Sequence, residues 1–136
     1  MTIENRSEIQ ELLANAKVIA VVGYSDKPSR TSYRIGQYLR SAGYKVYPVN
    51  PTVAEIDGEP SYPDLAAIPD PIDIVDVFRR SEYLSAIVDE AIAVGAKAIW
   101  AQLGVVDHNA AQRAEAAGLK VVMDRCIMVD HEQLLG

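Results

Sequence analysis

Apolar runs alternate with amphipathic stretches along the chain. Residues 18–22 (VIAVV) are an unbroken apolar run rich in β-branched side chains, which is typical of a strand buried on both faces. Comparable runs predict four further strands, at residues 45–50, 72–78, 97–102 and 120–123. The remaining segments repeat apolar residues every three or four positions, and this spacing predicts helices at residues 7–17, 31–42, 82–94 and 108–117, with a short closing helix at 131–135.

Polar residues and glycines mark the ends of these helices. Ser7, Ser81 and Asp107 stand where an N-cap belongs, and Gln10 follows Ser7 at the spacing of a capping box. Glycines stand where three of the helices should end, at positions 43, 95 and 118. Residues 51–71 are rich in Pro and Asp, so we expect a loop there, with a short strand near 58–60.

Helices of about a dozen residues between strands imply parallel βαβ units with right-handed crossovers. The sequence therefore predicts an α/β fold, a Rossmann-like doubly wound three-layer sandwich around a mainly parallel sheet of five or six strands. The 136 residues suit a single domain spanning 1–136, and the 49% apolar content is enough to form a core.

Composition excludes several classes of protein. The net charge of −6, without a Lys/Arg cluster, argues against binding to nucleic acids or anionic membranes. The N-terminal segment is polar and no apolar run approaches roughly 20 residues, so we expect neither a signal peptide nor a membrane helix. A single Cys suits a reducing compartment, and we expect a cytoplasmic protein. No residue group has metal-ligand spacing and no nucleophile motif occurs, so no metal and no catalytic residue is assigned.

The loop after the first strand is rich in hydrogen-bond donors. It reads GYSDKPSRTS, where Lys27 and Arg30 supply charge and four hydroxyl groups supply donors, at Ser25, Ser29, Thr31 and Ser32. Ligands of open parallel sheets bind at the carboxyl ends of the strands, and a helix N-terminus favours an anion. The sequence therefore predicts a phosphate-binding loop. The alternative is a solvated loop with a Ser/Thr helix cap.

A dinucleotide is a poor match to this loop. Of the usual G-x-G-x-x-G fingerprint only Gly23 and Gly36 stand nearby, thirteen positions apart. The acidic residue that would hold an NAD ribose at the end of the second strand is replaced by the neutral Asn50. The NAD interpretation thus lacks two of its three markers.

Five motifs in a fixed order resemble a known family. GYSDKPSRTSY, YPVNP, VDVFRR, AIWAQLGV and VVMDRC together resemble the small stand-alone CoA-binding proteins, over residues 18–126. Their fold is similar to that of the CoA-binding N-terminal domain of the succinyl-CoA synthetase alpha subunit. The resemblance implies that coenzyme A binds at the carboxyl edge of the sheet, through residues that follow the first four strands: Gly23, Tyr24, Ser25, Lys27, Pro28, Ser29 and Arg30; Pro48, Val49, Asn50 and Pro51; Phe78 and Arg79; Gln102 and Leu103.

The chemistry of these residues suits that ligand. CoA carries a pyrophosphate and a ribose 3′-phosphate, which Lys27, Arg30 and backbone donors would hold. The PVNP turn offers an apolar wall with Asn50 as a polar group. Phe78 adds a flat apolar face and Arg79 another cation; the alternative for this pair is a buried ring beside a surface charge.

The resemblance implies a CoA or acyl-CoA binder that carries, stores or senses its ligand. Related synthetases use a phosphorylated His and a nucleotide-grasping domain elsewhere in the protein, and this chain has neither, so no ligase activity of its own is expected. Two alternatives stay open. One is an NAD(P)-binding oxidoreductase-like or redox-regulatory protein, and the other is an accessory subunit of an acyl-CoA enzyme, whose protein partner the sequence does not identify.

Single polar residues are expected to be structural. Asp73 and Asp76 interrupt a strand, and we expect backbone donors or Arg to satisfy them. Trp100 is expected in the core, and His108 and His131 on the surface.

Cys126 follows the last strand by three residues. It is either a small apolar packing residue or, because it lies near the expected route of the pantetheine arm, a thiol able to form a mixed disulfide with CoA.

Overall fold

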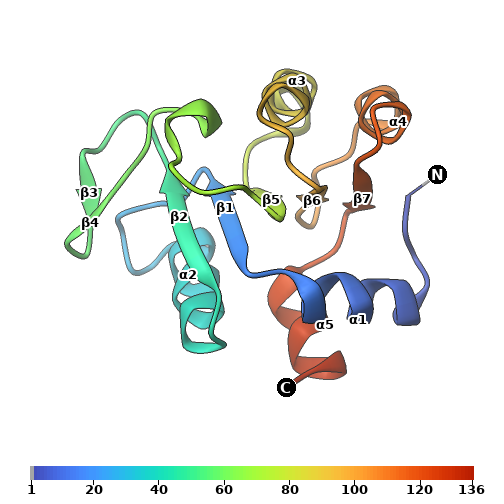
Figure 1. Ribbon diagram of the computed structural model, residues 1–136. Helices are drawn as coiled ribbons and strands as arrows, with labels where there is room; N and C mark the ends of the chain where they lie inside the picture. The colour runs from blue at the N-terminus through green and yellow to red at the C-terminus, as the bar shows by residue number, and fades with distance from the viewer. Residues whose placement is uncertain (1) are drawn as a thin grey trace.

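The computed structural model, which describes residues 2–136, is a three-layer α/β sandwich (Figure 1). Its central sheet has five strands, all parallel, in the order β2-β1-β5-β6-β7. The strands are β1 (Val18–Val22), β2 (Lys45–Val49), β5 (Ile74–Val77), β6 (Ala98–Ala101) and β7 (Lys120–Met123). The doubly wound parallel fold expected from the sequence is confirmed, with five strands rather than six in this sheet.

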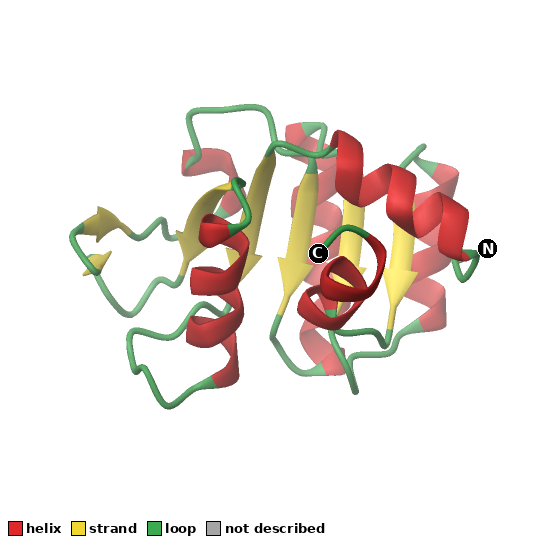
Figure 2. Cartoon of the chain, turned by 90° about the horizontal axis from the view of Figure 1, so that it is seen from below, coloured by secondary structure: helices red, strands yellow, loops and turns green. Residues whose placement is uncertain are grey.

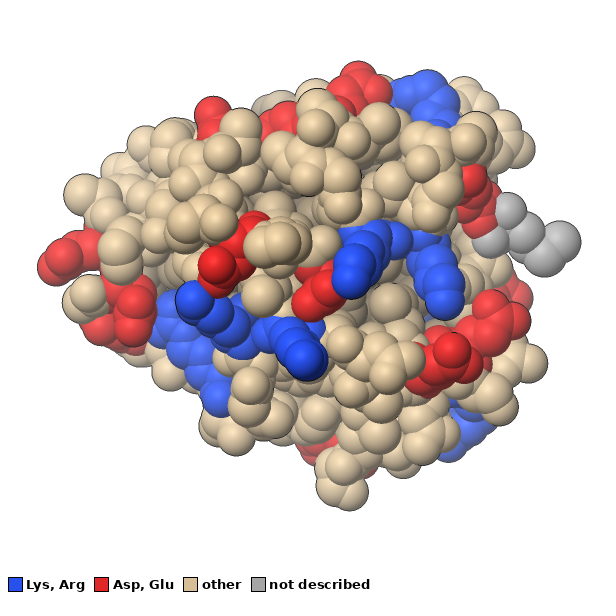
Figure 3. Space-filling view, in the orientation of Figure 1, with Lys and Arg blue, Asp and Glu red and all other residues tan. Residues whose placement is uncertain are grey.

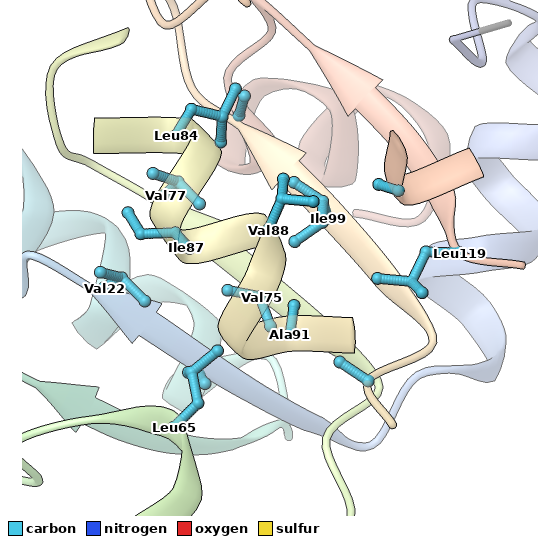
Figure 4. Close-up of a cluster of buried hydrophobic side chains, with 14 of the residues drawn as sticks. Val22, Leu65, Val75, Val77, Leu84, Ile87, Val88, Ala91, Ile99 and Leu119 are labelled. Atoms are coloured by element: carbon cyan, nitrogen blue, oxygen red, sulfur yellow. The ribbon is translucent and has the colours of Figure 1, made fainter. Parts of the chain in front are cut away.

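Helices cover both faces of the sheet (Figures 1 and 2). On one face lie α3 (Leu84–Val94) and α4 (His108–Ala116). The other face carries α1 (Arg6–Asn15), α2 (Thr31–Ser41) and α5 (Ile127–Leu134). Successive strand residues point to opposite layers, so Val75 and Val77 pack under α3 while Ile74 packs on the α1/α2/α5 side. Figure 4 shows the first of these two cores, with α3 crossing the sheet.

The strand order reverses direction between β1 and β5. From β1 the chain passes through α2 to β2 on one side, and β5, β6 and β7 then follow on the other side. The loops that leave the carboxyl ends of β1 and β5 therefore diverge and open a crevice between them. These carboxyl ends, where the arrows point, lie together along the lower edge of Figure 2.

A small hairpin projects beyond β2. It consists of β3 (Glu55–Ile56) and β4 (Glu59–Pro60), so the expected short strand near 58–60 is confirmed as half of a hairpin. Asp57 at its tip has a positive φ of 53°. The Asp57 carboxylate accepts hydrogen bonds from the Tyr33 hydroxyl and, at 2.8 Å, from Gln37 Nε2, which fastens the hairpin to α2.

Two of the expected helix caps are wrong. The side chain of Asn5, not Ser7, accepts hydrogen bonds from the first turn of α1, and the helix begins at Arg6. Ser81 opens a single 3₁₀ turn ahead of α3, and its hydroxyl bonds to the loop after β6 instead of capping the helix. Asp107 does cap α4 as expected, by accepting from the Ala110 N–H. The closing helix is longer than expected and starts at Ile127.

The buried polar residues divide into expected and unexpected cases. Trp100 is fully buried, and Asp73 accepts from the N–H groups of Lys17 and Val18, as predicted, with Lys97 rather than an Arg as its ion-pair partner. Asp76 contradicts the prediction, because both carboxylate oxygens are buried without a hydrogen-bond partner. Burial raises the pKa of Asp76 well above its ordinary value.

His131 is not the surface residue expected. It is buried between α5, α2 and the loop before β2, where the Tyr38 hydroxyl lies 2.7 Å from His131 Nδ1 and the Tyr38 and Tyr44 rings contact it edge-on. Burial lowers the pKa of His131. His108 is exposed, as expected.

Lysines line the opposite, amino edge of the sheet. Lys17, Lys45, Lys97 and Lys120 each stand at the first residue of a strand or just before it. Figure 3 shows Lys and Arg gathered in a band across this side of the molecule, between acidic groups. Because each of these lysines follows a helix, its charge lies near the negative C-terminal end of that helix, which is a favourable placement.

Candidate functional site

Two adjoining cavities open at the carboxyl edge of the sheet. The larger has a volume of about 500 Å³ and is bounded by the loop of residues 23–32, here called the cradle loop, together with Asn50, Thr52 and Phe78. The second, of about 380 Å³, lies toward α3 between Asn50, Arg79 and Glu90. Gly23, Asn50 and Thr52 line both cavities, so the two lie side by side at the ends of β1, β2 and β5.

The cradle loop is held in shape by its own serines. The Ser25 hydroxyl accepts from the Lys27 N–H at 3.1 Å, and the buried Ser32 hydroxyl accepts from the Ser25 N–H at 3.0 Å. The Arg30 N–H donates to the Lys27 carbonyl at 3.0 Å. These hydroxyls therefore fix the curvature of the loop, a role that the sequence did not distinguish from ligand binding.

The N-terminus of α2 opens into the larger cavity without a cap. Arg30 occupies the N-cap position and has no side-chain acceptor to offer, so no side chain satisfies the first-turn N–H groups of α2. Lys27 and Arg30 line the cavity and are exposed, and neither has an acidic partner among residues 2–136. Asp26 is the one acidic residue among those lining the cavity. Free donors, two cations and the positive helix end together favour an anion here.

Asn50 joins the two loops that form the crevice. Its Nδ2 donates to the Tyr24 carbonyl at 2.9 Å, while its Oδ1 accepts from the N–H of Thr52 at 3.0 Å and from the Thr52 hydroxyl at 2.7 Å. A carboxylate at this position would lose the donor to Tyr24. The neutral amide is thus explained by its place in the structure, independently of any ligand.

A side chain at position 23 is disfavoured, because the turn after β5 approaches Gly23 closely. Its φ is +88°, and a Cβ there would lie 3.2 Å from Arg79 Cδ and 3.4 Å from Phe78 Cβ. The Arg79 guanidinium in turn lies 4.3 Å from the centroid of the Tyr83 ring. Arg79 therefore spans from the cavity wall to the start of α3.

The structure brings most of the expected site residues together, but not all. Those that line the two cavities are Gly23, Ser25, Lys27, Ser29, Arg30, Val49, Asn50, Pro51, Phe78 and Arg79. Those that line neither are Tyr24, Pro28, Pro48, Gln102 and Leu103. Tyr24 is fully buried against α2, and the Gln102 Oε1 accepts from the Ile127 N–H at 3.2 Å. A role for these five in ligand contact stays a prediction.

Sequence reasoning missed the residues that close the second cavity. Leu65 and Glu90 face each other there, since the Leu65 N–H donates to Glu90 Oε1 at 3.3 Å. They come from a loop and a helix that no local motif connects. Thr52 was also missed, although an Asn followed two residues later by Thr is a recognisable Asx turn.

Cys126 stands at the N-cap position of α5, half-buried. It packs against the core on the α1/α2/α5 side, which favours the packing interpretation. The neighbouring Arg125 is held by two hydrogen bonds of 2.8 and 2.7 Å to Asp130.

A further cavity, of about 470 Å³, lies at the amino edge between the ends of α1, α3 and α4. The negative ends of three helices point toward it, and Glu11 and Asp73 line it. These charges offset Lys97 and Lys120, so this cavity is a weaker candidate for an anionic ligand.

Across residues 2–136 no cluster of His, Cys, Asp and Glu suits a metal ion, and no helix is long and apolar enough to cross a membrane.

Comparison with known proteins agrees with this geometry. The chain is 45% identical over 127 residues to the uncharacterized protein YneT of Bacillus subtilis, which covers 93% of this chain and 94% of that protein. A solved structure of a hypothetical protein from Pyrococcus horikoshii OT3 has a TM-score of 0.95 at 40% identity, covering 100% of this chain and 97% of the other.

A much larger protein also matches. The chain is 28% identical over 127 residues to acetate–CoA ligase (ADP-forming) I of Archaeoglobus fulgidus, covering 86% of this chain but 18% of the ligase. A family model described as a CoA binding domain matches residues 17–132. With its sheet, its cradle loop and its crevice all inside those residues, the chain belongs to the CoA binding domain family.

Proposed function

We propose that this protein binds coenzyme A, or an acyl-CoA, in the double cavity at the carboxyl edge, and that it carries, stores or senses this ligand without ligase activity of its own. The observation that carries the proposal is the uncapped N-terminus of α2, flanked by the unpaired cations Lys27 and Arg30 and facing the switch point of the sheet. Membership of the CoA binding domain family supports the choice of CoA among anionic ligands.

The two cavities offer different chemistry to the two ends of a nucleotide. The larger cavity, with its donors and cations, suits the phosphates. The second has Val22, Val49 and Leu65 among its walls, with Asp64 and Glu90 as acceptors, and it suits a flat base with an exocyclic amino group. We assign the adenine to the second cavity on this basis.

Calorimetric titration with CoA, 3′-dephospho-CoA and NADH at one ionic strength tests the proposal. We expect CoA to bind most tightly, dephospho-CoA less tightly and NADH most weakly, because NADH lacks the 3′-phosphate and finds no acidic residue after β2. Tight NADH binding without CoA binding would establish the oxidoreductase-like alternative instead.

A pair of lysine variants provides the control. Lys27→Ala should weaken CoA binding, whereas Lys120→Ala, at the far edge of the sheet, should not. Equal losses of CoA affinity in the two variants would mean that CoA responds only to the net charge of the protein.

The accessory-subunit alternative predicts an acyl-CoA enzyme that co-purifies with the chain, and affinity capture from cell extract tests it.

A further inference from the structure

Three exposed apolar side chains stand on neighbouring turns at the carboxyl edge. Leu103 is 67% exposed, Tyr83 42% and Val106 36%. Tyr83 lies in the 3₁₀ turn between β5 and α3, and Leu103 and Val106 lie in the loop after the neighbouring strand β6. We call these three residues the apolar shelf. Grouped apolar exposure of this kind indicates a binding surface more often than isolated exposure does.

The turns that carry the shelf are tied to each other. The Ser81 hydroxyl donates to the Gly104 carbonyl at 3.2 Å and accepts from the Val106 N–H at 2.8 Å. The Asp124 carboxylate, after β7, accepts from the Gly104 N–H at 2.7 Å. Three successive loops are thus joined by hydrogen bonds, and the exposed Leu103 is presented on a fixed turn.

The shelf adjoins the candidate site through Arg79. Arg79 lines the second cavity and also lies over the ring of Tyr83. Phe78, which lines the larger cavity, lies beside Gln102 just past the ends of β5 and β6, since the Gln102 N–H donates to the Val77 carbonyl. On the other side of the crevice the hairpin is fastened to α2 through Asp57. A ligand that extends from the cradle loop past Phe78 would therefore approach the loop that carries Leu103.

We infer that the apolar shelf receives the acyl group of an acyl-CoA, so that the protein prefers apolar acyl-CoA thioesters to free CoA. This inference rests on the proposed function and specifies the form of the ligand. From β1 to β6 is two strand spacings, roughly 10 Å, which an extended pantetheine arm exceeds. Free CoA ends in a thiol and gains little from leucine and valine, whereas each buried methylene of an acyl chain tightens binding roughly fourfold.

The size of the shelf also favours a small ligand. A stable protein interface buries about 800 Å² on each partner, which is more than three side chains on two turns provide. An acyl chain of a few carbons matches the shelf more closely than a second protein surface does.

Calorimetry with CoA and hexanoyl-CoA, both in the presence of a reductant, tests the inference. For the wild type we expect hexanoyl-CoA to bind about tenfold more tightly than CoA, because part of the chain stays in water. Leu103→Ser should weaken the binding of hexanoyl-CoA more than that of CoA and so abolish most of this difference. Leu103→Met, which keeps an apolar side chain, should retain the difference.

The matched control is Leu135→Ser, which removes another exposed leucine, at the C-terminus of the chain. It should leave both affinities unchanged. Circular dichroism checks folding, and Val106→Ser replaces Leu103→Ser if the latter unfolds.

Each other outcome has a definite meaning. Equal affinities of wild type for the two ligands would overturn the inference and leave the proposed function intact. If Leu103→Ser lost affinity for CoA and for hexanoyl-CoA equally, the inference would also be overturned, because Leu103 would then contact the part that the two ligands share. Failure of both ligands to bind the wild type would overturn the proposed function itself.

Discussion

The ring of Tyr24 fills the space in which a side chain at Gly36 would lie. A Cβ on residue 36 would be 2.2 Å from Tyr24 Cε2, well inside contact distance. Gly36 is therefore required, because Tyr24 of the cradle loop packs onto the middle of α2 at this position. This contact joins the candidate site to the core, because Tyr24 also offers its carbonyl to Asn50.

Gly36→Ala should destabilise the protein although alanine is the better helix former. Forcing the Tyr24 ring aside costs about 1–3 kcal/mol, against roughly 1 kcal/mol gained in helix propensity. Urea unfolding measures the net loss. In a Tyr24→Ala background the same substitution should be neutral or stabilising, and an equal cost in both backgrounds would contradict the packing described.

Arg30→Ala should weaken CoA binding by about one to two orders of magnitude, since a charge-assisted hydrogen bond contributes roughly 1.5–3 kcal/mol. Stability should hardly change, because the side chain is exposed and unpaired. Titration calorimetry measures the affinity, with Arg6→Ala on α1 as the matched control. An unaltered Kd would place Arg30 outside the site.

Asp76→Val should stabilise the protein near neutral pH. The pKa of Asp76 is raised in the folded state, so above pH 3.8 the unfolded chain loses a proton that the folded chain keeps. The free energy of unfolding of the wild type then falls by about 1.4 kcal/mol per pH unit until the folded pKa is reached. Valine removes this dependence and is close to aspartate in size.

The measurement is the difference in unfolding free energy between variant and wild type from pH 4 to pH 8. It should grow with pH for Asp76→Val. A flat difference for Asp76→Val would mean that this carboxyl ionises normally.

His131→Gln should reduce the loss of protein stability that occurs as the pH falls below 6.5. Burial lowers the pKa of His131, so its contribution is complete above pH 6.5 and is lost as pH falls through the folded pKa. Gln can still form a hydrogen bond with the Tyr38 hydroxyl but does not titrate. Thermal unfolding of the variant and the wild type between pH 5 and pH 7 tests this.

The sequence predicted those features that depend on short-range patterns. The apolar run at Val18–Val22 and the glycine that follows it are sufficient to place the first strand and the cradle loop at its carboxyl end. Sheet order and crevice then follow from general rules of parallel sheets. The Asp107 cap was likewise readable, because the cap and its helix are adjacent in the chain.

Features that depend on contacts between distant segments were not predictable. His131 and Asp76 look like ordinary polar residues in the sequence, and only the packing of α5 and of the sheet determines that both are buried. The apolar periodicity of residues 31–42 gave no sign that Tyr24 would occupy the surface beside Gly36. Glu90 reaches the second cavity only because α3 folds back over the loop that holds Leu65.

The arrangement of the lysines gives this protein a built-in chemical reporter. The chain has five lysines, and the four that begin strands lie at the edge opposite the candidate site, which leaves Lys27 as the only lysine in the cradle loop. If CoA binds as proposed, it should protect Lys27 from an amine-reactive reagent, while the other four lysines serve as internal references.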